Sequence, residues 1–152
     1  MAGTGVDALD VHVLDVMFRP ALTVPGQVRV LVELRLIEWG LTQLVDDVTL
    51  IASELVTNAV QHTFGPQVRV RFTREPHGVL LGVWDGSDVL PVRGRAAETA
   101  SNTAGPDAVP LEAGQEDETS GRGLPIVEAL ATRFGVSLTQ PHGKWTWARV
   151  SA

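Results

Sequence analysis

Residues 50–62 read Leu-Ile-Ala-Ser-Glu-Leu-Val-Thr-Asn-Ala-Val-Gln-His and contain the clearest pattern in the chain. At about 100° per residue its polar positions fall on one continuous arc, which predicts a helix with its apolar side against a core. A solvated helix face is enough to explain such an arc. A carboxylate and an amide one turn apart at its edge also suit an oxygen-ligated cation such as Mg²⁺. The arc consists of Ser53, Thr57, Gln61, Glu54, Asn58 and His62.

Composition limits the classes of protein to consider. The chain has 152 residues, of which 44% are hydrophobic and 20% charged, as expected for one globular domain. The lack of cysteine excludes disulfides and thiol nucleophiles, and the four scattered histidines argue against a transition-metal site. A net charge of −6 argues against direct binding to nucleic acid. No apolar run approaches the roughly 20 residues of a membrane span, and the acidic N-terminus does not resemble a signal peptide, so we expect a cytoplasmic protein.

Hydrophobic periodicity predicts hairpins rather than a strict alternation of strand and helix. The expected fold class is therefore α+β, a two-layer sandwich of a mostly antiparallel sheet with helices on one face. We expect a flexible N-terminus over 1–10 and a single domain over 11–150. The expected elements are a strand at 11–18, a helix at 25–39, a helix from Thr42 or Asp46 to His62, strands at 67–74 and 79–84, a helix at 123–134, and strands at 136–139 and 145–150.

One long segment, from about Ser87 to Arg122, lacks the composition of a packed element. Between Arg93 and Ser120 it holds no aromatic residue, and its six acids outnumber its two arginines. Such a segment cannot bury enough apolar surface to order itself. A functional lid and a disordered insert both remain open for it.

Two short motifs admit both a bland and a functional interpretation. Asp85-Gly86-Ser87 follows an apolar strand, where an acid forms a turn or accepts a hydrogen bond from a ligand's amino group. Gly121-Arg122-Gly123 precedes a predicted helix, where free backbone N–H groups serve as a hinge or bind phosphate.

Other residues favour structural roles. His62 is expected at the rim of a pocket rather than as a base, and the four tryptophans at 39, 84, 145 and 147 are expected in packing. The arginines at 69, 71 and 74 form a basic stripe, which a solvated strand face or an acidic partner would explain.

Taken together, the motifs resemble the GHKL (Bergerat-fold) ATP-binding superfamily, and within it the small bacterial anti-sigma-factor serine/threonine kinases. The resemblance covers about residues 11–150. It is carried by the order of Glu-x-x-x-Asn on a helix, Asp-Gly after a strand, a long loop, and Gly-x-Gly before a helix. The closest wording lies at 53–60, Ser-Glu-Leu-Val-Thr-Asn-Ala-Val, and at 121–124, Gly-Arg-Gly-Leu.

The resemblance implies ATP and Mg²⁺ as cofactors and assigns roles to individual residues. Glu54 would be the general base toward a serine or threonine hydroxyl, and Asn58 would coordinate Mg²⁺. Asp85 would accept a hydrogen bond from the adenine amino group, with Gly86 beneath the base. The segment 87–120 would be the ATP lid, and the phosphates would be held by Gly121, Arg122, Gly123 and Leu124.

The resemblance also implies partners. The chain would sequester a sigma factor, phosphorylate an antagonist protein and form a homodimer. The alternative is a catalytically weak or inactive interaction module of the same fold that regulates transcription. Three departures motivate it: Asp85-Gly86-Ser87-Asp88 lacks a later glycine, Trp145 stands where relatives often place a threonine, and the lid segment is acidic. Thr146 is expected on the strand face opposite Trp145.

Overall fold

The computed structural model describes residues 12–63, 65–87, 100–102 and 125–152. Its centre is a six-stranded sheet in the order β1-β2-β3-β6-β5-β4. Neighbouring strands are antiparallel except for β4, which pairs parallel with β5. The strands are β1 (Val13–Phe18), β2 (Val68–Glu75), β3 (Gly78–Asp85), β4 (Ala100–Asn102), β5 (Arg133–Thr139) and β6 (Lys144–Ser151).

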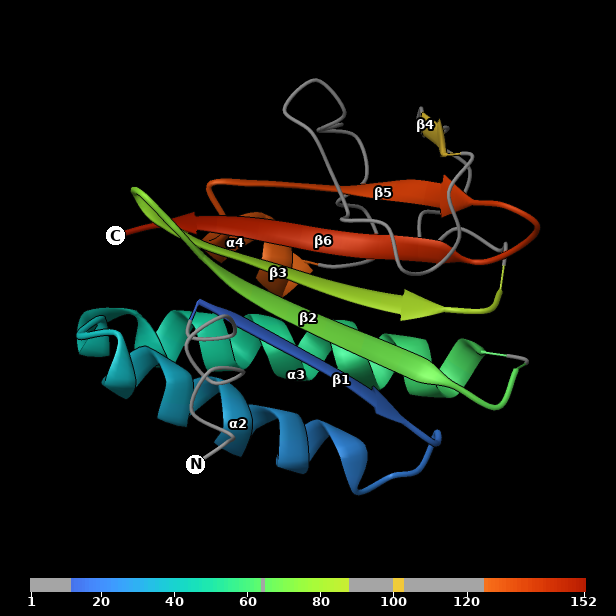
Figure 1. The fold of residues 1–152 in the computed structure, drawn as a ribbon, viewed down its shortest axis with the longest axis horizontal. Coiled ribbons are helices and arrows are strands. Elements are labelled where there is room, and N and C mark those ends of the chain that lie inside the picture. Colours follow the sequence, from blue (N-terminus) through green and yellow to red (C-terminus); the bar gives the residue numbers. More distant parts are fainter. Residues whose placement is uncertain (1–11, 64, 88–99, 103–124) are drawn as a thin grey trace, which may run out of the picture.

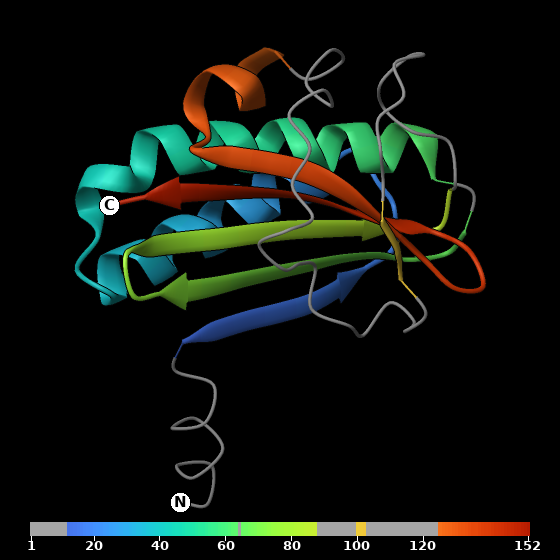
Figure 2. The ribbon, with the colours of Figure 1, turned by 90° about the horizontal axis from the view of Figure 1, so that it is seen from above.

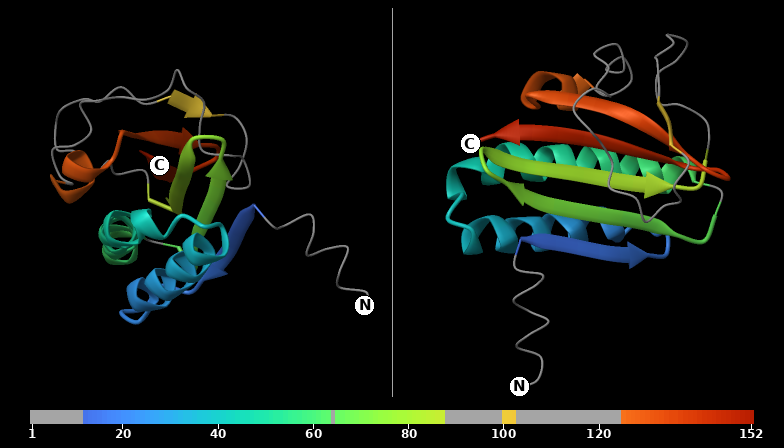
Figure 3. Two further views of the ribbon diagram at one scale, coloured as in Figure 1. Left: turned by 90° about the vertical axis from the view of Figure 1, so that its left-hand side faces the viewer. Right: turned by 45° about the horizontal axis from the view of Figure 1, so that its top comes forward.

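The helices lie together on one face of this sheet, as Figures 1 and 2 show. Seen end-on, the two long helices run side by side beneath the strands (Figure 3). This arrangement confirms the expected two-layer α+β class. The helical elements are α2 (Val24–Glu38), the short 3₁₀ turn η1 (Thr42–Leu44), α3 (Val45–His62) and α4 (Pro125–Leu130).

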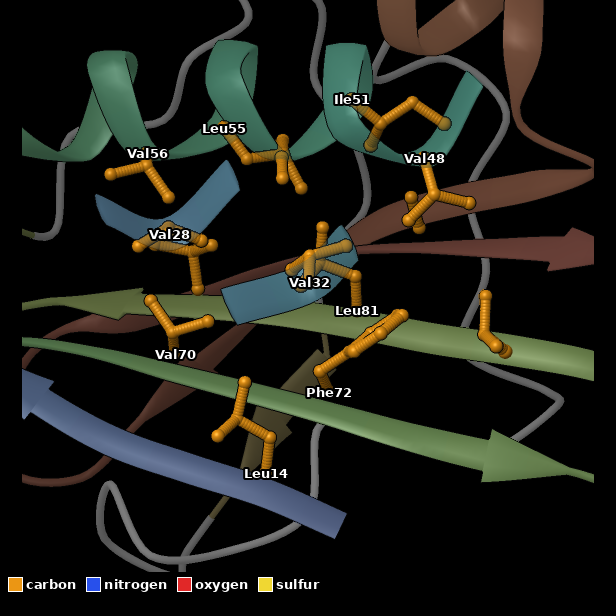
Figure 4. Close-up of a cluster of buried hydrophobic side chains, with 14 of the residues drawn as sticks. Leu14, Val28, Val32, Val48, Ile51, Leu55, Val56, Val70, Phe72 and Leu81 are labelled. Carbon is orange, nitrogen blue, oxygen red and sulfur yellow. The ribbon is translucent and has the colours of Figure 1, made fainter. Parts of the chain in front are cut away.

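The core lies between α2, α3 and the sheet. Every fourth residue at the start of α2, from Val24 through Val28 to Val32, is buried, and α3 presents its own apolar stripe beside it. Figure 4 shows these side chains meeting Val70 and Phe72 of β2 and Leu81 of β3. The expected helix boundaries are close to the observed ones here, because the apolar period of each helix is long and uninterrupted.

The opposite face of the sheet carries aromatic and charged side chains. Trp84, Trp145 and Trp147 belong to this face and are all buried, and Trp39 is buried on the helix side, so the expected packing role of the tryptophans is confirmed. On β1, Asp15 accepts hydrogen bonds from Arg69 and from Arg71, the shortest at 2.8 and 2.7 Å. Burial alone would raise the pKa of Asp15, but the hydrogen bonds and charges of the two guanidinium groups outweigh it and lower this pKa.

The prediction for the C-terminal helix was wrong at its end. That helix was expected to continue to Phe134 and stop at Gly135, but α4 ends at Leu130 and β5 already begins at Arg133. Gly135 lies within β5, opposite Trp147 of β6. A Cβ at Gly135 would lie 2.8 Å from Cζ2 of Trp147, so this glycine makes room for the indole and does not end a helix.

The acidic segment also contains one element that was not expected. Residues 100–102 form β4 against the free edge of β5. The rest of the proposed lid, apart from Ser87, and the expected flexible N-terminus lie outside the described residues.

Candidate nucleotide site at the end of α3 and β3

The polar arc of α3 is divided between two surfaces. Ser53, Thr57 and Gln61 line a groove of about 400 Å³ beside the start of α2. Arg29 of α2 reaches Oγ of Ser53 across this groove at 3.5 Å. These three polar residues therefore belong to the α2 side and are separate from the Glu54 edge.

The remaining edge of the arc leads to the end of β3. Glu54 and Asn58 are half-buried one turn apart on α3, and His62 follows one turn later. Nδ1 of His62 lies 2.9 Å from the backbone oxygen of Asn58. His62 is exposed, as expected for a rim position, and its neighbour Thr63 contacts Gly86, the residue after Asp85. The row from Glu54 to His62 thus leads toward the end of β3.

Thr63 connects α3 to β3 at this point. Its Oγ1 accepts hydrogen bonds from the backbone N–H of Gly86 at 3.2 Å and from that of Gly65 at 3.4 Å. One side-chain oxygen thereby fixes the C-terminus of α3 relative to the residue that follows β3. Sequence reasoning missed this role.

Asp85 is the most enclosed acid of the site. It is 2% exposed, and its Oδ1 accepts the backbone N–H of Ser87 at 2.8 Å. Nζ of Lys144, itself 1% exposed, donates to Oδ1 at 2.9 Å and to Oδ2 at 3.1 Å. Burial raises the pKa of Asp85 above its ordinary value, while Lys144, the Ser87 N–H and His62 act in the opposite direction.

Gly86 leaves space next to this acid. A Cβ placed there would meet its nearest atoms, Cε1 of His142 and the backbone N of Gly65, at 3.6 and 3.7 Å. These are ordinary van der Waals distances, so packing among the described residues does not demand a glycine. The small residue fits a position where a flat ligand approaches the backbone.

The support for Asp85 comes from a different residue than the resemblance suggested. Trp145 pairs with Trp84 and Lys144 pairs with Asp85, and directly paired residues share a face of the sheet. Trp145 therefore lies on the face opposite Asp85, whereas Thr146, two residues after Lys144, lies on the same face as Asp85. Trp145 and Thr146 lie on opposite faces, as expected, and the side chain of β6 that supports the acid is Lys144. As the only lysine of the chain, Lys144 was the available signal.

Glu54 and Asn58 lie on α3 before its C-terminus, which Thr63 joins to Gly86, the residue that follows Asp85 at the end of β3. Gly121, Arg122, Gly123 and Leu124 lie outside the described residues, so their phosphate-binding role stays a prediction. Among the described residues no cluster of three or more His, Asp or Glu side chains could hold a metal ion. A magnesium ion would still fit the oxygens of Asn58 and Glu54, because it needs few protein ligands and keeps water and phosphate oxygens. In the same part of the chain, no helix is long and apolar enough to cross a membrane.

A comparison with family models matches residues 19–150 to the histidine kinase-like ATPase domain. A search of curated proteins returned no match. The matched range contains all of the residues assigned above to the site and every helix and strand except β1 and the last residue of β6. With most of its length matched, the chain belongs to the histidine kinase-like ATPase domain family.

Proposed function

We propose that this domain binds Mg-ATP at the end of α3 and β3 and transfers the γ-phosphoryl group to a serine or threonine of an antagonist protein. In its other role it sequesters a sigma factor, acting as a homodimer in the cytoplasm. The observation that carries the proposal is the row of Glu54 and Asn58 on one edge of α3, whose C-terminus Thr63 joins to the residue after the buried Asp85. Family membership supports the ATP-binding part.

Four residues have a chemical task in this proposal. Asp85 accepts a hydrogen bond from the exocyclic amino group of adenine, and Gly86 leaves room for the ring. Asn58 offers its side-chain oxygen to the metal ion, and Glu54 accepts the proton of the attacking hydroxyl. When bound, magnesium neutralises charge on the phosphates. The protein otherwise positions the reactants, which is the largest part of what phosphoryl transfer requires.

The test separates nucleotide binding from phosphoryl transfer. We expect Asn58→Ala to weaken Mg-ATP binding at least about tenfold in calorimetry, because it removes a metal ligand. Glu54→Ala should keep nucleotide binding but lose transfer of ³²P from γ-labelled ATP to serine or threonine in a cell extract of the source organism. Gln61→Ala is the matched control, since Gln61 lies on the same helix but lines the α2 groove. The absence of saturable binding by the wild type at millimolar Mg-ATP would refute the proposal.

A second candidate is an interaction module of the same fold without nucleotide turnover. One observation favours it: the carboxylate of Asp85 already has a buried internal partner in Lys144. Client binding that is unchanged by ATP and by Glu54→Ala would support this candidate over the kinase.

A further inference from the structure

Lys144 uses its whole hydrogen-bonding capacity inside the protein. A lysine ammonium group has three N–H donors. In this structure Nζ has three acceptors: Oδ1 of Asp85 at 2.9 Å, Oδ2 of Asp85 at 3.1 Å, and the backbone oxygen of Ser87 at 3.2 Å. Lys144 therefore has no donor left for a ligand, and its effect on a ligand must pass through Asp85.

The same bonds leave Asp85 with a spare acceptor position. Each carboxylate oxygen can accept about two hydrogen bonds. Oδ1 accepts from Lys144 and from the backbone of Ser87, while among the described residues Oδ2 accepts from Lys144 alone. The free position on Oδ2 can take one N–H donor and offers nothing to a ligand's acceptor.

Strand register places this pair where a base would bind. Asp85 and Lys144 are directly paired across β3 and β6, with both side chains on the face that α3 covers. Among the described residues, the groups that act on the Asp85 carboxylate are Lys144 from β6, His62 from α3 and the Ser87 N–H. Its neighbour on β2 is the apolar Val68. Without Lys144, a carboxylate in these surroundings has little left to keep it charged.

We propose that Lys144 is a positioning residue of the nucleotide site, which holds the Asp85 carboxylate with one acceptor free and so commits the site to a base that carries an amino group. This inference rests on the proposed nucleotide binding. In the interaction-module candidate the ion pair occupies Asp85 in place of a ligand. Here, in contrast, Lys144 orients Asp85 for the ligand and does not block it.

The test compares two nucleotides that differ only in the amino group. Mg-ATP and Mg-purine riboside triphosphate have the same triphosphate, so the ratio of their Kd values cancels phosphate ionisation. In the wild type we expect ATP to bind at least about tenfold more tightly, because a hydrogen bond to a charged group is lost with the purine analogue. This ratio should stay constant between about pH 6 and pH 9.

Lys144→Met removes the charge and keeps the length of the side chain. Burial then raises the pKa of Asp85 further, so the acid takes up a proton and its remaining acceptor is a neutral carbonyl oxygen, which forms a weaker hydrogen bond. We expect the preference for ATP to shrink at pH 6 and to return to the wild-type ratio as the pH rises and Asp85 ionises. The series is repeated in a His62→Gln background, which removes the other titratable group beside Asp85. Arg74→Met, at an exposed cation of β2, is the control and should behave as the wild type.

A double variant covers the case in which Lys144→Met does not fold. Asp85→Asn with Lys144→Met leaves no lone buried charge, and it should fold and show a smaller preference for ATP at every pH, because the amide oxygen is a neutral acceptor. An undiminished preference for ATP in either variant at every pH would overturn the proposal, as would equal weakening of both nucleotides by Lys144→Met. If the wild type binds neither nucleotide, the proposed function itself fails. If the wild type binds both equally, only the inference about Lys144 fails.

Discussion

Single side-chain atoms join separate elements at the candidate site. Oγ1 of Thr63 holds the ends of α3 and β3 together through two backbone N–H groups, and Nζ of Lys144 joins β6 to the end of β3. Both contacts depend on where the strands and helix end, because Gly86 is 23 residues from Thr63 and Asp85 is 59 residues from Lys144.

Thr63→Val tests the first of these contacts. Valine has the shape of threonine but no oxygen, so the N–H groups of Gly65 and Gly86 lose their acceptor. We expect the free energy of unfolding to fall by about 1 kcal/mol in urea titrations. Thr73→Val on β2 makes the same chemical change within a strand and should cost less than about 0.5 kcal/mol. Equal effects of the two variants would mean that the Thr63 contact contributes nothing.

The place of Asp85 at the end of an apolar strand could be predicted from the sequence, whereas its partner Lys144 could not. The role of Asp85 toward a ligand stays a prediction. Which residue of β6 faces it depends on the register set by the turn before β6, where Gly143 has a φ of +95°. A Cβ at Gly143 would lie 2.4 Å from Cζ2 of Trp84, so that turn is fixed by packing across the sheet. The number of residues after Gly143 alone does not predict which side chain of β6 faces Asp85.

At the scale of elements, α3 has three different neighbours along one helix. Its apolar stripe packs on the sheet and α2, one part of its polar arc lines the α2 groove, and the other part leads to Asp85. Its existence and length were predicted well because its apolar period is regular over the whole helix. The division of the polar arc was not predictable, since it depends on where α2 crosses.

The apolar stripe of α3 predicts a large difference between two leucines of this helix. Leu55 is 1% exposed in the core, whereas Leu50 is 50% exposed. We expect Leu55→Ala to lower the free energy of unfolding by about 2–5 kcal/mol, because it leaves a cavity. Leu50→Ala should change it by less than about 0.5 kcal/mol. Similar losses in denaturant titrations of the two variants would contradict the burial of this face.

The boundary between α4 and β5 shows where local preference gives way to tertiary contacts. Residues 131–135 read Ala-Thr-Arg-Phe-Gly, and a glycine after a helical pattern usually indicates a helix end. In the fold, Phe134 and Gly135 instead pair with β6, and the Trp147 indole lies over Gly135. Pairing with β6, and not the local sequence, therefore determines that these residues form a strand.

For the molecule as a whole, the sheet has a protected centre and an open edge. β3 and β6 are paired on both sides and buried on both faces, while β1 pairs only with β2 and exposes alternate residues. The fold class could be predicted from the hairpin pattern because each strand of 67–85 has a clear apolar set and a turn between them.

This contrast predicts the order of amide hydrogen exchange. Backbone amides of β3 and β6 should exchange more slowly than those of β1, because local opening requires breaking fewer contacts at the edge. Mass spectrometry of peptic fragments measures the rates, and the chemically denatured chain supplies the intrinsic exchange of each fragment. Protection of β1 equal to that of β3 would contradict the topology.

The buried ion pair also has a consequence for the chemical reactivity of the protein. Lys144 is the only lysine among the 152 residues, and it is 1% exposed. A reagent that modifies primary amines therefore finds, besides the α-amino group of the chain, a single target that is buried and paired with Asp85. Acylation of Lys144 requires this end of the sheet to open, and it replaces the charge that Asp85 needs with a neutral amide. The rate at which Lys144 is acylated therefore measures how often this end of the sheet opens, and the experiment needs no introduced label.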